Sequence, residues 1–262
     1  MSKPKLLWKY VKYRIRSKTN YDVHSPFLFE FINSVLNDEK NYYAFEEIEF
    51  IRQQMLTDTS VITVEDFGAG SKKNKSNIRQ VSAIAKNTLI TPKFGKLLFR
   101  IANYYQTKNI IELGTSLGIS TLYLSKAVEN AKVITLEGSS EIANIASINF
   151  KKTKTDNVTL LTGEFSQKLP LALTLLKKID LAFIDGNHRK QPTLDYFSLL
   201  LTHIDENSII VFDDIHWSDE MEEAWNIIKA HSAVSLSIDL FFKGIIFFRK
   251  DFHRKQNFQI SF

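Results

Sequence analysis

The sequence predicts an α/β fold, with a doubly wound, mostly parallel sheet, a C-terminal antiparallel hairpin and a helical N-terminal cap. From about Thr91 onward, strand-like apolar runs alternate with helix-like segments, as they do in a parallel sheet covered by helices on both faces. Two β-rich runs, Val234–Leu240 and Gly244–Phe248, follow each other too closely for a crossover helix, so they must pair antiparallel. The alternation is absent from residues 1–90, which we assign to the cap, and residues 91–262 form the core domain.

The elements of the core follow in order. Thr91 and Pro92 begin a helix, because threonine caps a first turn and proline fits within it. Ser218 caps the last helix in the same way, and acidic residues follow it. Apolar runs predict strands near 109–113, 133–137, 158–162, 180–184 and 208–212. Amphipathic spacing predicts helices near 119–128, 140–151, 192–202 and 218–231.

The cap begins with a basic arm. Seven lysines and arginines precede the first acid, Asp22, and apolar residues recur between them at helical spacing: Leu7, Trp8, Val11 and Ile15. The arm is therefore predicted to form a basic amphipathic helix. Its apolar stripe either packs on its own domain or serves peripheral contact with an anionic membrane, a nucleic acid or an acidic partner. Two more cap helices are expected near 24–36 and 45–56.

Composition narrows the class of protein. The chain of 262 residues is 44% hydrophobic and 24% charged, as in an ordinary globular protein, with a net charge of +5. It has no cysteine, which excludes disulfides, thiol nucleophiles and zinc–thiolate sites. The longest apolar runs have the length of strands, so no transmembrane helix is expected. The basic N-terminus lacks the apolar core of a secretory signal, and we expect a cytoplasmic protein.

Two glycine-containing turns follow predicted strands and compete for a ligand site. The first, Asp66–Ser71, follows Val61–Val64 and continues into a polar lysine-rich stretch with no ribose-binding acid nearby. The second, Gly114–Gly118, leads into an apolar helix, and Glu137 stands at the end of the next strand, where a carboxylate accepts hydrogen bonds from a ribose diol. The second turn therefore predicts a nucleoside site.

The spacing from Glu112 to Gly118 is E-x-G-x-x-x-G and lacks the third glycine of a dinucleotide-binding turn. It resembles motif I of the Rossmann-like class I S-adenosylmethionine-dependent methyltransferases, over roughly Pro92 to Lys250. The run from Glu112 to Ser120, ELGTSLGIS, is most similar to the catechol and caffeoyl-coenzyme A O-methyltransferases. This resemblance implies S-adenosylmethionine as cofactor and the following cofactor-binding residues: Glu112, Gly114, Thr115, Ser116, Gly118, Ser120, Glu137, Gly163, Glu164, Phe165 and Asp185. For Glu164, the alternative is an exposed loop acid.

Acids follow the fourth and fifth predicted strands, at the edge where open α/β sheets bind ligands. They are Asp185, Asp213 and Asp214. In the metal-dependent relatives these positions hold a divalent cation, and three carboxylates suit Mg²⁺ or another hard cation. The alternative is that Asp185 orients the cofactor or a loop, while the Asp213–Asp214 pair caps the helix beginning near Ser218.

Histidines near these acids are candidates for acid–base chemistry. The resemblance implies a lysine general base at the position of His188, three residues after Asp185, and a histidine could serve there because imidazole titrates near neutrality. His188 and Asp185 are therefore the predicted catalytic pair, although His188 also fits plain loop surface. His216 and Trp217 are expected either to line the acceptor pocket or to serve ordinary packing.

The function expected from the resemblance is methylation of a hydroxyl on a small-molecule acceptor. The basic arm keeps open an RNA or protein methyltransferase, although no stable nucleic-acid complex is expected. A non-catalytic cofactor-fold module that docks a membrane or a partner is the alternative from another class. The run from Asn257 to Phe262 is rich in β-formers and is expected to pair with a partner's edge in a homodimer.

Overall fold

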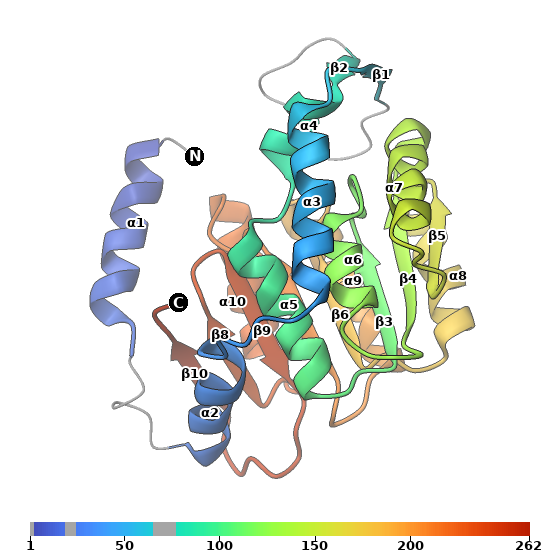
Figure 1. The fold of residues 1–262 in the computed structure, drawn as a ribbon. Coiled ribbons are helices and arrows are strands. Elements are labelled where there is room, and N and C mark those ends of the chain that lie inside the picture. Colours follow the sequence, from blue (N-terminus) through green and yellow to red (C-terminus); the bar gives the residue numbers. More distant parts are fainter. Residues whose placement is uncertain (1–2, 19–24, 65–76) are drawn as a thin grey trace. The chain divides into compact units, whose positions relative to one another are not determined.

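The computed structural model describes residues 3–18, 25–64 and 77–262 (Figure 1). The chain divides into two compact units. The terminal unit comprises residues 1–37 and 177–262, and the middle unit comprises residues 38–176. The division does not follow the expected boundary at residue 90, because the N-terminal segment belongs to the same unit as the C-terminal strands. The glycine turn Asp66–Ser71 lies outside the described residues.

The middle unit contains three parallel strands in the order β3, β4, β5. Their bounds are Asn109–Leu113, Lys132–Glu137 and Val158–Thr162. Ile110 and Ile111 of β3 and Ile134 of β4 are fully buried, as expected for strands with both faces covered. The helices that follow these strands are α6 (Ile119–Ser125), α7 (Ser140–Lys152) and α8 (Phe165–Leu176).

Helix α8 is absent from the sequence expectation. Pro170 lies inside it, and proline removes a backbone N–H from the helix interior. The helix forms nevertheless, because Leu169, Leu173 and Leu176 recur at helical spacing and are buried, and α8 contacts β3 and β4. Tertiary packing thus outweighs the local preference of proline.

The N-terminal part of the middle unit is mostly helical, as expected of the cap. It comprises α3 (Ala44–Thr57), the antiparallel pair β1 (Val61–Thr63) and β2 (Ile78–Gln80), α4 (Val81–Thr88) and α5 (Pro92–Tyr104). Helix α3 is tied to α6 by a hydrogen bond of 2.6 Å from the Tyr123 hydroxyl to Glu49. Gly95 of α5 packs so close to the Tyr123 ring that a Cβ there would lie 2.3 Å from it.

The terminal unit contains the remaining strands of the sheet, in the order β6, β7, β9, β8, β10. Their bounds are Leu181–Ile184, Ile209–Asp213, Lys243–Phe247, Leu236–Asp239 and Gln256–Gln259. β6 and β7 are parallel, whereas β9 is antiparallel to both β7 and β8. The predicted C-terminal antiparallel hairpin is therefore confirmed, and the chain is a mixed α/β protein with mostly parallel strands.

The last strand corrects one expectation. The run from Asn257 was expected to pair with a partner's edge, but β10 pairs in parallel with β8 of its own chain. A bridge between Lys18 and Ile260 continues this pairing into the N-terminal segment. One edge of the run is thus already used within the chain.

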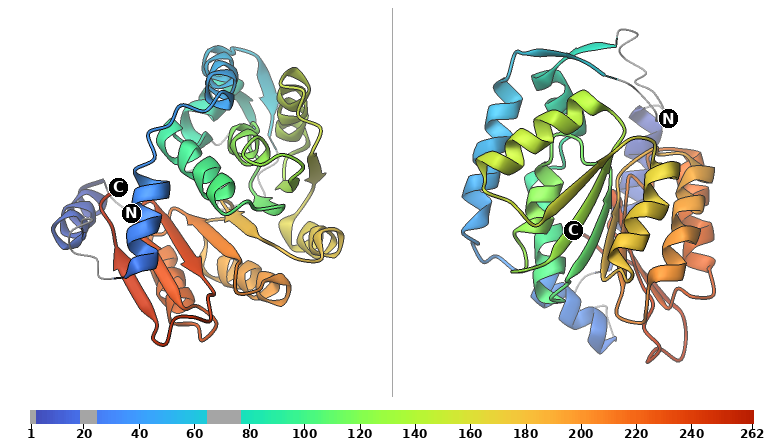
Figure 2. Two further views of the ribbon diagram at one scale, coloured as in Figure 1. Left: turned by 60° about the horizontal axis from the view of Figure 1, so that its bottom comes forward. Right: turned by 90° about the vertical axis from the view of Figure 1, so that its right-hand side faces the viewer.

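Helices α9 (Lys190–Leu200) and α10 (Asp219–Ala230) of the terminal unit contact each other, and Figure 2 shows them side by side. Ser218 caps α10 as predicted, because its hydroxyl accepts a hydrogen bond of 3.1 Å from the Met221 N–H. Trp225 of α10 is buried, and a Cβ at Gly244 of β9 would lie 2.7 Å from its ring. The glycine therefore lets β9 and α10 approach closely.

The N-terminal helices also belong to the terminal unit. α2 (Pro26–Phe31) continues as a π-helical turn (Ile32–Leu36), and Phe27 and Phe31 pack edge-on against Phe247 of β9. The arm forms α1 (Lys3–Arg16), which confirms the predicted helix. Its predicted apolar stripe, however, is exposed and does not pack on the protein. No helix in the described part of the chain is long and apolar enough to cross a membrane.

Candidate active site

A strained turn connects β3 to α6. Gly114, Ser116 and Gly118 all have positive φ, at 105°, 48° and 88°. The side of Gly118 that a Cβ would occupy faces Phe150 of α7, at 2.7 Å, and not open space. This glycine therefore serves close helix packing as well as the turn itself, whereas Ser116 pays the conformational cost of a left-handed residue with a side chain.

Glu137 ends β4 with its carboxylate held toward this turn. One carboxylate oxygen accepts a hydrogen bond of 2.8 Å from the Ser116 N–H, and the other accepts one of 3.1 Å from the Ser139 N–H. Burial raises the pKa of Glu137, and the backbone N–H donors act in the opposite direction. The carboxylate is thus fixed at a strand end, the position from which the sequence analysis expected it to bind a ribose.

Glu112 lies beneath the turn and is fully buried. Its Oε2 accepts hydrogen bonds from the hydroxyls of Thr135, at 2.6 Å, and Thr121. Burial raises the pKa of Glu112 to about 7, and hydrogen bonds from the hydroxyls of Ser120, Thr121 and Thr135 act in the opposite direction. The structure therefore places Glu112 as an internal support of the turn.

The other predicted cofactor residues divide into buried and exposed groups. Thr115 and Ser120 are buried, and the Thr115 hydroxyl lies 2.6 Å from that of Thr135. Gly163, with a φ of 132°, donates its N–H to the Glu137 carbonyl at 2.8 Å, so the ends of β4 and β5 are joined. Glu164 is exposed, and its carboxylate accepts a hydrogen bond from Gln167, as in the alternative of a loop acid.

Carboxylates crowd at the ends of β6 and β7 in the terminal unit. Asp213 Oδ1 accepts hydrogen bonds from the Asp214 N–H, at 2.6 Å, and from the Lys243 ammonium. Burial raises the pKa of Asp185 well above its ordinary value, and the charge of Asp213 raises it further. Burial and the same charge raise the pKa of Asp214 to about 6. The three acids therefore repel one another and share a single lysine.

The position of Lys243 follows from strand register. It begins β9 directly opposite Asp213 of β7, so their side chains lie on the same face of the sheet. Lys243 is 5% exposed. Lys243 is not among the site residues predicted from the sequence. The sequence does contain a signal for this role, because a lysine at the start of an otherwise apolar strand indicates a partner for a buried acid.

His188 lies in a strained turn after β6. Asn187 and His188 both have positive φ, at 67° and 34°. The turn brings His188 Nε2 to 3.6 Å from Asp185 Oδ1, and the histidine side chain remains 30% exposed. Asn187 donates a hydrogen bond of 3.2 Å to the Tyr196 hydroxyl of α9. Strained backbone at a ligand-binding edge is typical of functional turns, and His188 and Asp185 are brought together as predicted.

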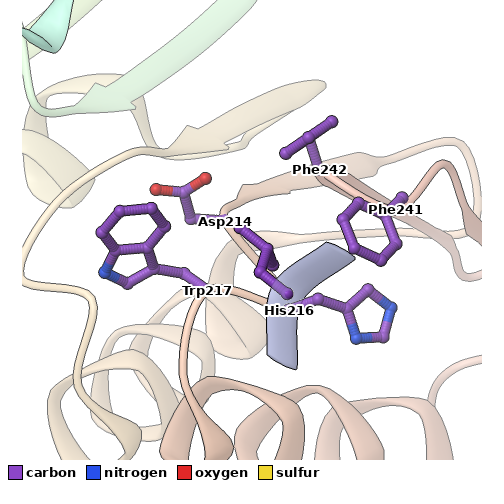
Figure 3. A pocket seen from close by; sticks show the side chains of 6 residues that line it. Asp214, His216, Trp217, Phe241 and Phe242 are labelled. Atoms are coloured by element: carbon purple, nitrogen blue, oxygen red, sulfur yellow. The ribbon is translucent and has the colours of Figure 1, made fainter. Parts of the chain in front are cut away.

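A small pocket adjoins these acids (Figure 3). Its lining comprises Leu6, Asp214, His216, Trp217, Phe241 and Phe242. Asp214 and Trp217 lie on one side of it, with Phe241 and Phe242 on the other. Aromatic side chains and one carboxylate therefore face a hollow of about 160 Å³, which is smaller than the roughly 300–1,000 Å³ of usual ligand pockets.

His216 is held rigidly at the edge of this pocket. Its Nδ1 lies 2.8 Å from Glu222 Oε1 and its Nε2 lies 2.9 Å from Asp239 Oδ2, while its ring stacks on Phe241. Burial disfavours the charged imidazole, but the hydrogen bonds and charges of Asp239 and Glu222 outweigh it and raise the pKa of His216. Two carboxylates thus engage both ring nitrogens, which leaves this histidine a structural role.

The predicted metal ligands do not fit a metal site in this arrangement. No group of three or more histidine or acidic side chains in the described ranges is placed to hold a metal ion. The Lys243 ammonium already occupies an oxygen of Asp213. The alternative role for Asp213 and Asp214 is also wrong, because Ser218 alone caps α10 with a side chain. The lysine is therefore the cation that this cluster contains.

Comparison with known proteins agrees with the fold and the position of the turn. Residues 111–215 match the model of a methyltransferase domain family. A catechol O-methyltransferase of Niastella koreensis is 34% identical over 129 residues, which cover 48% of this chain and 58% of the relative. One from Mycobacterium tuberculosis is 29% identical over 48% of this chain and 56% of the relative. The chain thus spans little more than half the length of these relatives.

Solved structures extend the likeness over most of the chain. The O-methyltransferase from Bacillus cereus in complex with SAH aligns with a TM-score of 0.57 and 19% identity, over 84% of this chain and 97% of the other. The SAH-bound methyltransferase PaMTH1 of Podospora anserina aligns with a TM-score of 0.59 and 16% identity, over 87% and 98%. These solved structures share the fold of the chain, and the residues that match the methyltransferase domain model include the turn after β3 and the acid that ends β4.

Proposed function

We propose that this protein transfers a methyl group from S-adenosylmethionine to a hydroxyl oxygen of a small acceptor. The observation that carries the proposal is the Glu137 carboxylate, which is fixed at the end of β4 by the N–H groups of Ser116 and Ser139. The names of the relatives, catechol O-methyltransferases and an O-methyltransferase in complex with SAH, support the same class of reaction.

The residues around the β3–α6 turn fit this cofactor. Glu137 would accept hydrogen bonds from the ribose diol, and the turn from Gly114 to Ser116 would hold the amino-acid end through its backbone, with Ser120 nearby in α6. When bound, the sulfonium supplies an electrophilic methyl group, so the protein needs mainly to align the acceptor and remove its proton.

His188 is the proposed general base. Its exposed imidazole would take the proton of the acceptor hydroxyl as the oxygen–carbon bond forms, and Asp185, 3.6 Å away, would stabilise the resulting imidazolium. The aromatic side chains of Trp217, Phe241 and Phe242 would contact the acceptor ring. A planar phenolic or catechol-like molecule meets both requirements.

We further propose that the positive charge at this edge of the sheet comes from Lys243 and that the transfer does not depend on a divalent cation. Lys243 is buried, fixed opposite Asp213 by register, and bonded to its carboxylate. An ammonium in this position offsets the charge of the acids and would favour the developing oxyanion of the acceptor. The homodimer stays a prediction, because pairing with β8 uses one edge of β10 and β10 lies at the end of the sheet.

Titration calorimetry with S-adenosylmethionine tests the cofactor site. Glu137→Ala is expected to weaken binding by about 100-fold, because two hydrogen bonds to a charged group are each worth roughly 1.5–3 kcal/mol before the groups regain water. Glu129→Gln is the matched control, since Glu129 is exposed and is not among the predicted cofactor residues, and it should change affinity by less than about threefold. Equal affinity in wild type and Glu137→Ala would remove the proposed ribose site.

Transfer of a labelled methyl group to a panel of catechols and phenols tests the reaction. We expect turnover with at least one acceptor, and the same rate after exhaustive treatment with a chelator. A rate that falls on chelation and returns with Mg²⁺ would contradict the role given to Lys243 while leaving the methyl transfer itself intact. Absence of transfer to every hydroxyl acceptor would count against the proposed reaction.

A further inference from the structure

Helix α1 presents an apolar stripe to solvent. The exposed fractions are 64% for Leu7, 59% for Trp8 and 79% for Ile15, and Val11 is also exposed. We infer that α1 docks the protein on the surface of an anionic lipid bilayer. This inference is independent of the proposed methyl transfer, because it rests on the outer face of one helix.

The orientation of α1 is fixed by the opposite face. Tyr13 is buried, its hydroxyl donates to the Ile260 carbonyl, and Tyr10 packs edge-on against Phe241 at 5.0 Å. Lys5 pairs with Asp219 at 2.6 Å, and Lys9 pairs with Glu222 at 2.6 Å. These contacts hold the helix against α10 and the last strands, so its apolar stripe faces outward and cannot turn inward without breaking them.

The outward face has the pattern of a helix that lies in a membrane interface. At about 100° per residue, Leu7, Trp8, Val11 and Ile15 fall within an arc of roughly 100°. Lys12 and Arg14 flank this arc on either side, and both are exposed. Lys12 Nζ lies 4.9 Å from the centre of the Trp8 ring. α1 contains no acidic residue, so nothing on its own face opposes an anionic surface.

The apolar arc favours a bilayer over a nucleic acid as the partner of α1. A phosphate backbone would use the cations but would leave Leu7, Val11 and Ile15 in water, whereas the interface of a bilayer buries them. Two of the cations, Lys5 and Lys9, are already paired with acids of α10 and are less available to an anionic polymer. The helix has 14 residues, too few to cross a bilayer, so it lies on the surface.

Docking by α1 also bears on the pocket. Leu6, on the inward side of the same helix, lines the pocket together with Asp214 and Trp217. Trp217 is itself exposed. A bilayer bound to the outer face of α1 would therefore lie one helix away from this pocket.

Sedimentation with lipid vesicles tests the inference. The full-length protein is expected to bind vesicles with about a third phosphatidylserine at least tenfold more tightly than pure phosphatidylcholine vesicles. Leu7→Ser/Ile15→Ser should weaken binding by about tenfold or more, since both side chains are exposed and their loss removes apolar area without affecting the fold. Leu171→Ser, at an exposed leucine of α8, is the matched control and should bind like wild type.

A second pair of variants separates lipid from nucleic acid. Lys12→Glu/Arg14→Glu should abolish the preference for phosphatidylserine, because it reverses the charges beside the arc. Binding of a single-stranded RNA that exceeds vesicle binding, and that Leu7→Ser/Ile15→Ser leaves unchanged, would overturn the inference in favour of a nucleic acid. Equal binding of both vesicle types would overturn it as well. Calorimetry with S-adenosylmethionine on the same variants should remain unchanged, which keeps this result separate from that of the proposed reaction.

Discussion

The carboxylates at the ends of β3 and β4 have different partners from those at the ends of β6 and β7. Glu137 and Glu112 each accept hydrogen bonds from neutral donors, and burial raises the pKa of Glu112 more than the charge of Glu137 does. Asp185, Asp213 and Asp214 instead crowd together and share the Lys243 ammonium. The first arrangement suits the binding of a neutral diol. The second stores electrostatic repulsion, which suits chemistry at a charged atom.

The two regions also differ in how they hold their turns. In the middle unit, the glycines Gly114 and Gly118 share the left-handed positions with Ser116. In the terminal unit, Asn187, His188 and Asp214 adopt positive φ without any glycine, which costs about 1–3 kcal/mol at each such position. Both turns therefore place residues with side chains in left-handed conformations, one of them in the cradle for the cofactor and three at the proposed acceptor edge.

Of the changes that distinguish the two regions, Lys243→Met is expected to have the largest effect, a loss of unfolding free energy. Removing this ammonium leaves buried acids without a counter-charge, which costs about 3–5 kcal/mol of unfolding free energy. The loss should be greater at pH 8 than at pH 5, because Lys243 lowers the pKa of Asp185 and its removal favours the protonated acid. Urea denaturation at both pH values measures this.

Two controls sharpen that measurement. Lys250→Met removes an exposed ion pair with Glu206 and should cost less than about 1 kcal/mol. The double variant Asp213→Asn/Lys243→Met removes both charges and should recover much of the lost stability. A cost for Lys243→Met as small as that for Lys250→Met would mean that the acids at this edge do not depend on the lysine.

The next effect concerns catalysis at the strained edge. His188→Gln should lower kcat by about 100-fold, the usual contribution of a general base. Its affinity for S-adenosylmethionine should stay unchanged, since the proposed cofactor residues at the ends of β3 and β4 belong to the other region. His253→Gln, at an exposed histidine, serves as the control. If His188→Gln kept full kcat at every pH, His188 would have no part in proton transfer.

The sequence predicts local patterns better than it predicts contacts that depend on strand register or on packing. The turn from Gly114 to Gly118 and the acid at Glu137 are local patterns, and the strands beside them have continuous apolar runs. The contact between Lys243 and Asp213 could not be predicted in the same way, because it depends on the register between β7 and β9. The two residues are 30 positions apart in the sequence. Helix α8 was missed because Pro170 argues locally against the packing that forms it.

The exposed face of α1 shows a related limit. The spacing of Leu7, Trp8, Val11 and Ile15 predicts an amphipathic helix, but not which side faces the protein. The ion pairs of Lys5 and Lys9 with α10 and the burial of Tyr13 decide that question. These partners lie more than 200 residues away in the chain.

The smallest effect, on Glu112, tests how strongly burial acts on a carboxylate at the ends of β3 and β4. Burial raises the pKa of Glu112 to about 7, from an ordinary value of 4.5. A carboxyl whose pKa is raised on folding stabilises the protein fully below the ordinary value, and this contribution is lost as the pH rises through the folded pKa. Between pH 5 and pH 8 the wild type should therefore lose about 2 kcal/mol that Glu112→Gln, which does not titrate, retains.

The comparison is between the slopes of unfolding free energy against pH, because the glutamine also carries a constant packing cost that does not vary with pH. Glu141→Gln, at an exposed acid of α7, should keep the wild-type slope. Parallel slopes for wild type and Glu112→Gln would mean that the carboxylate is ionised without penalty. In that case a donor other than the threonines must reach its second oxygen, and the contrast between the two strand edges would weaken.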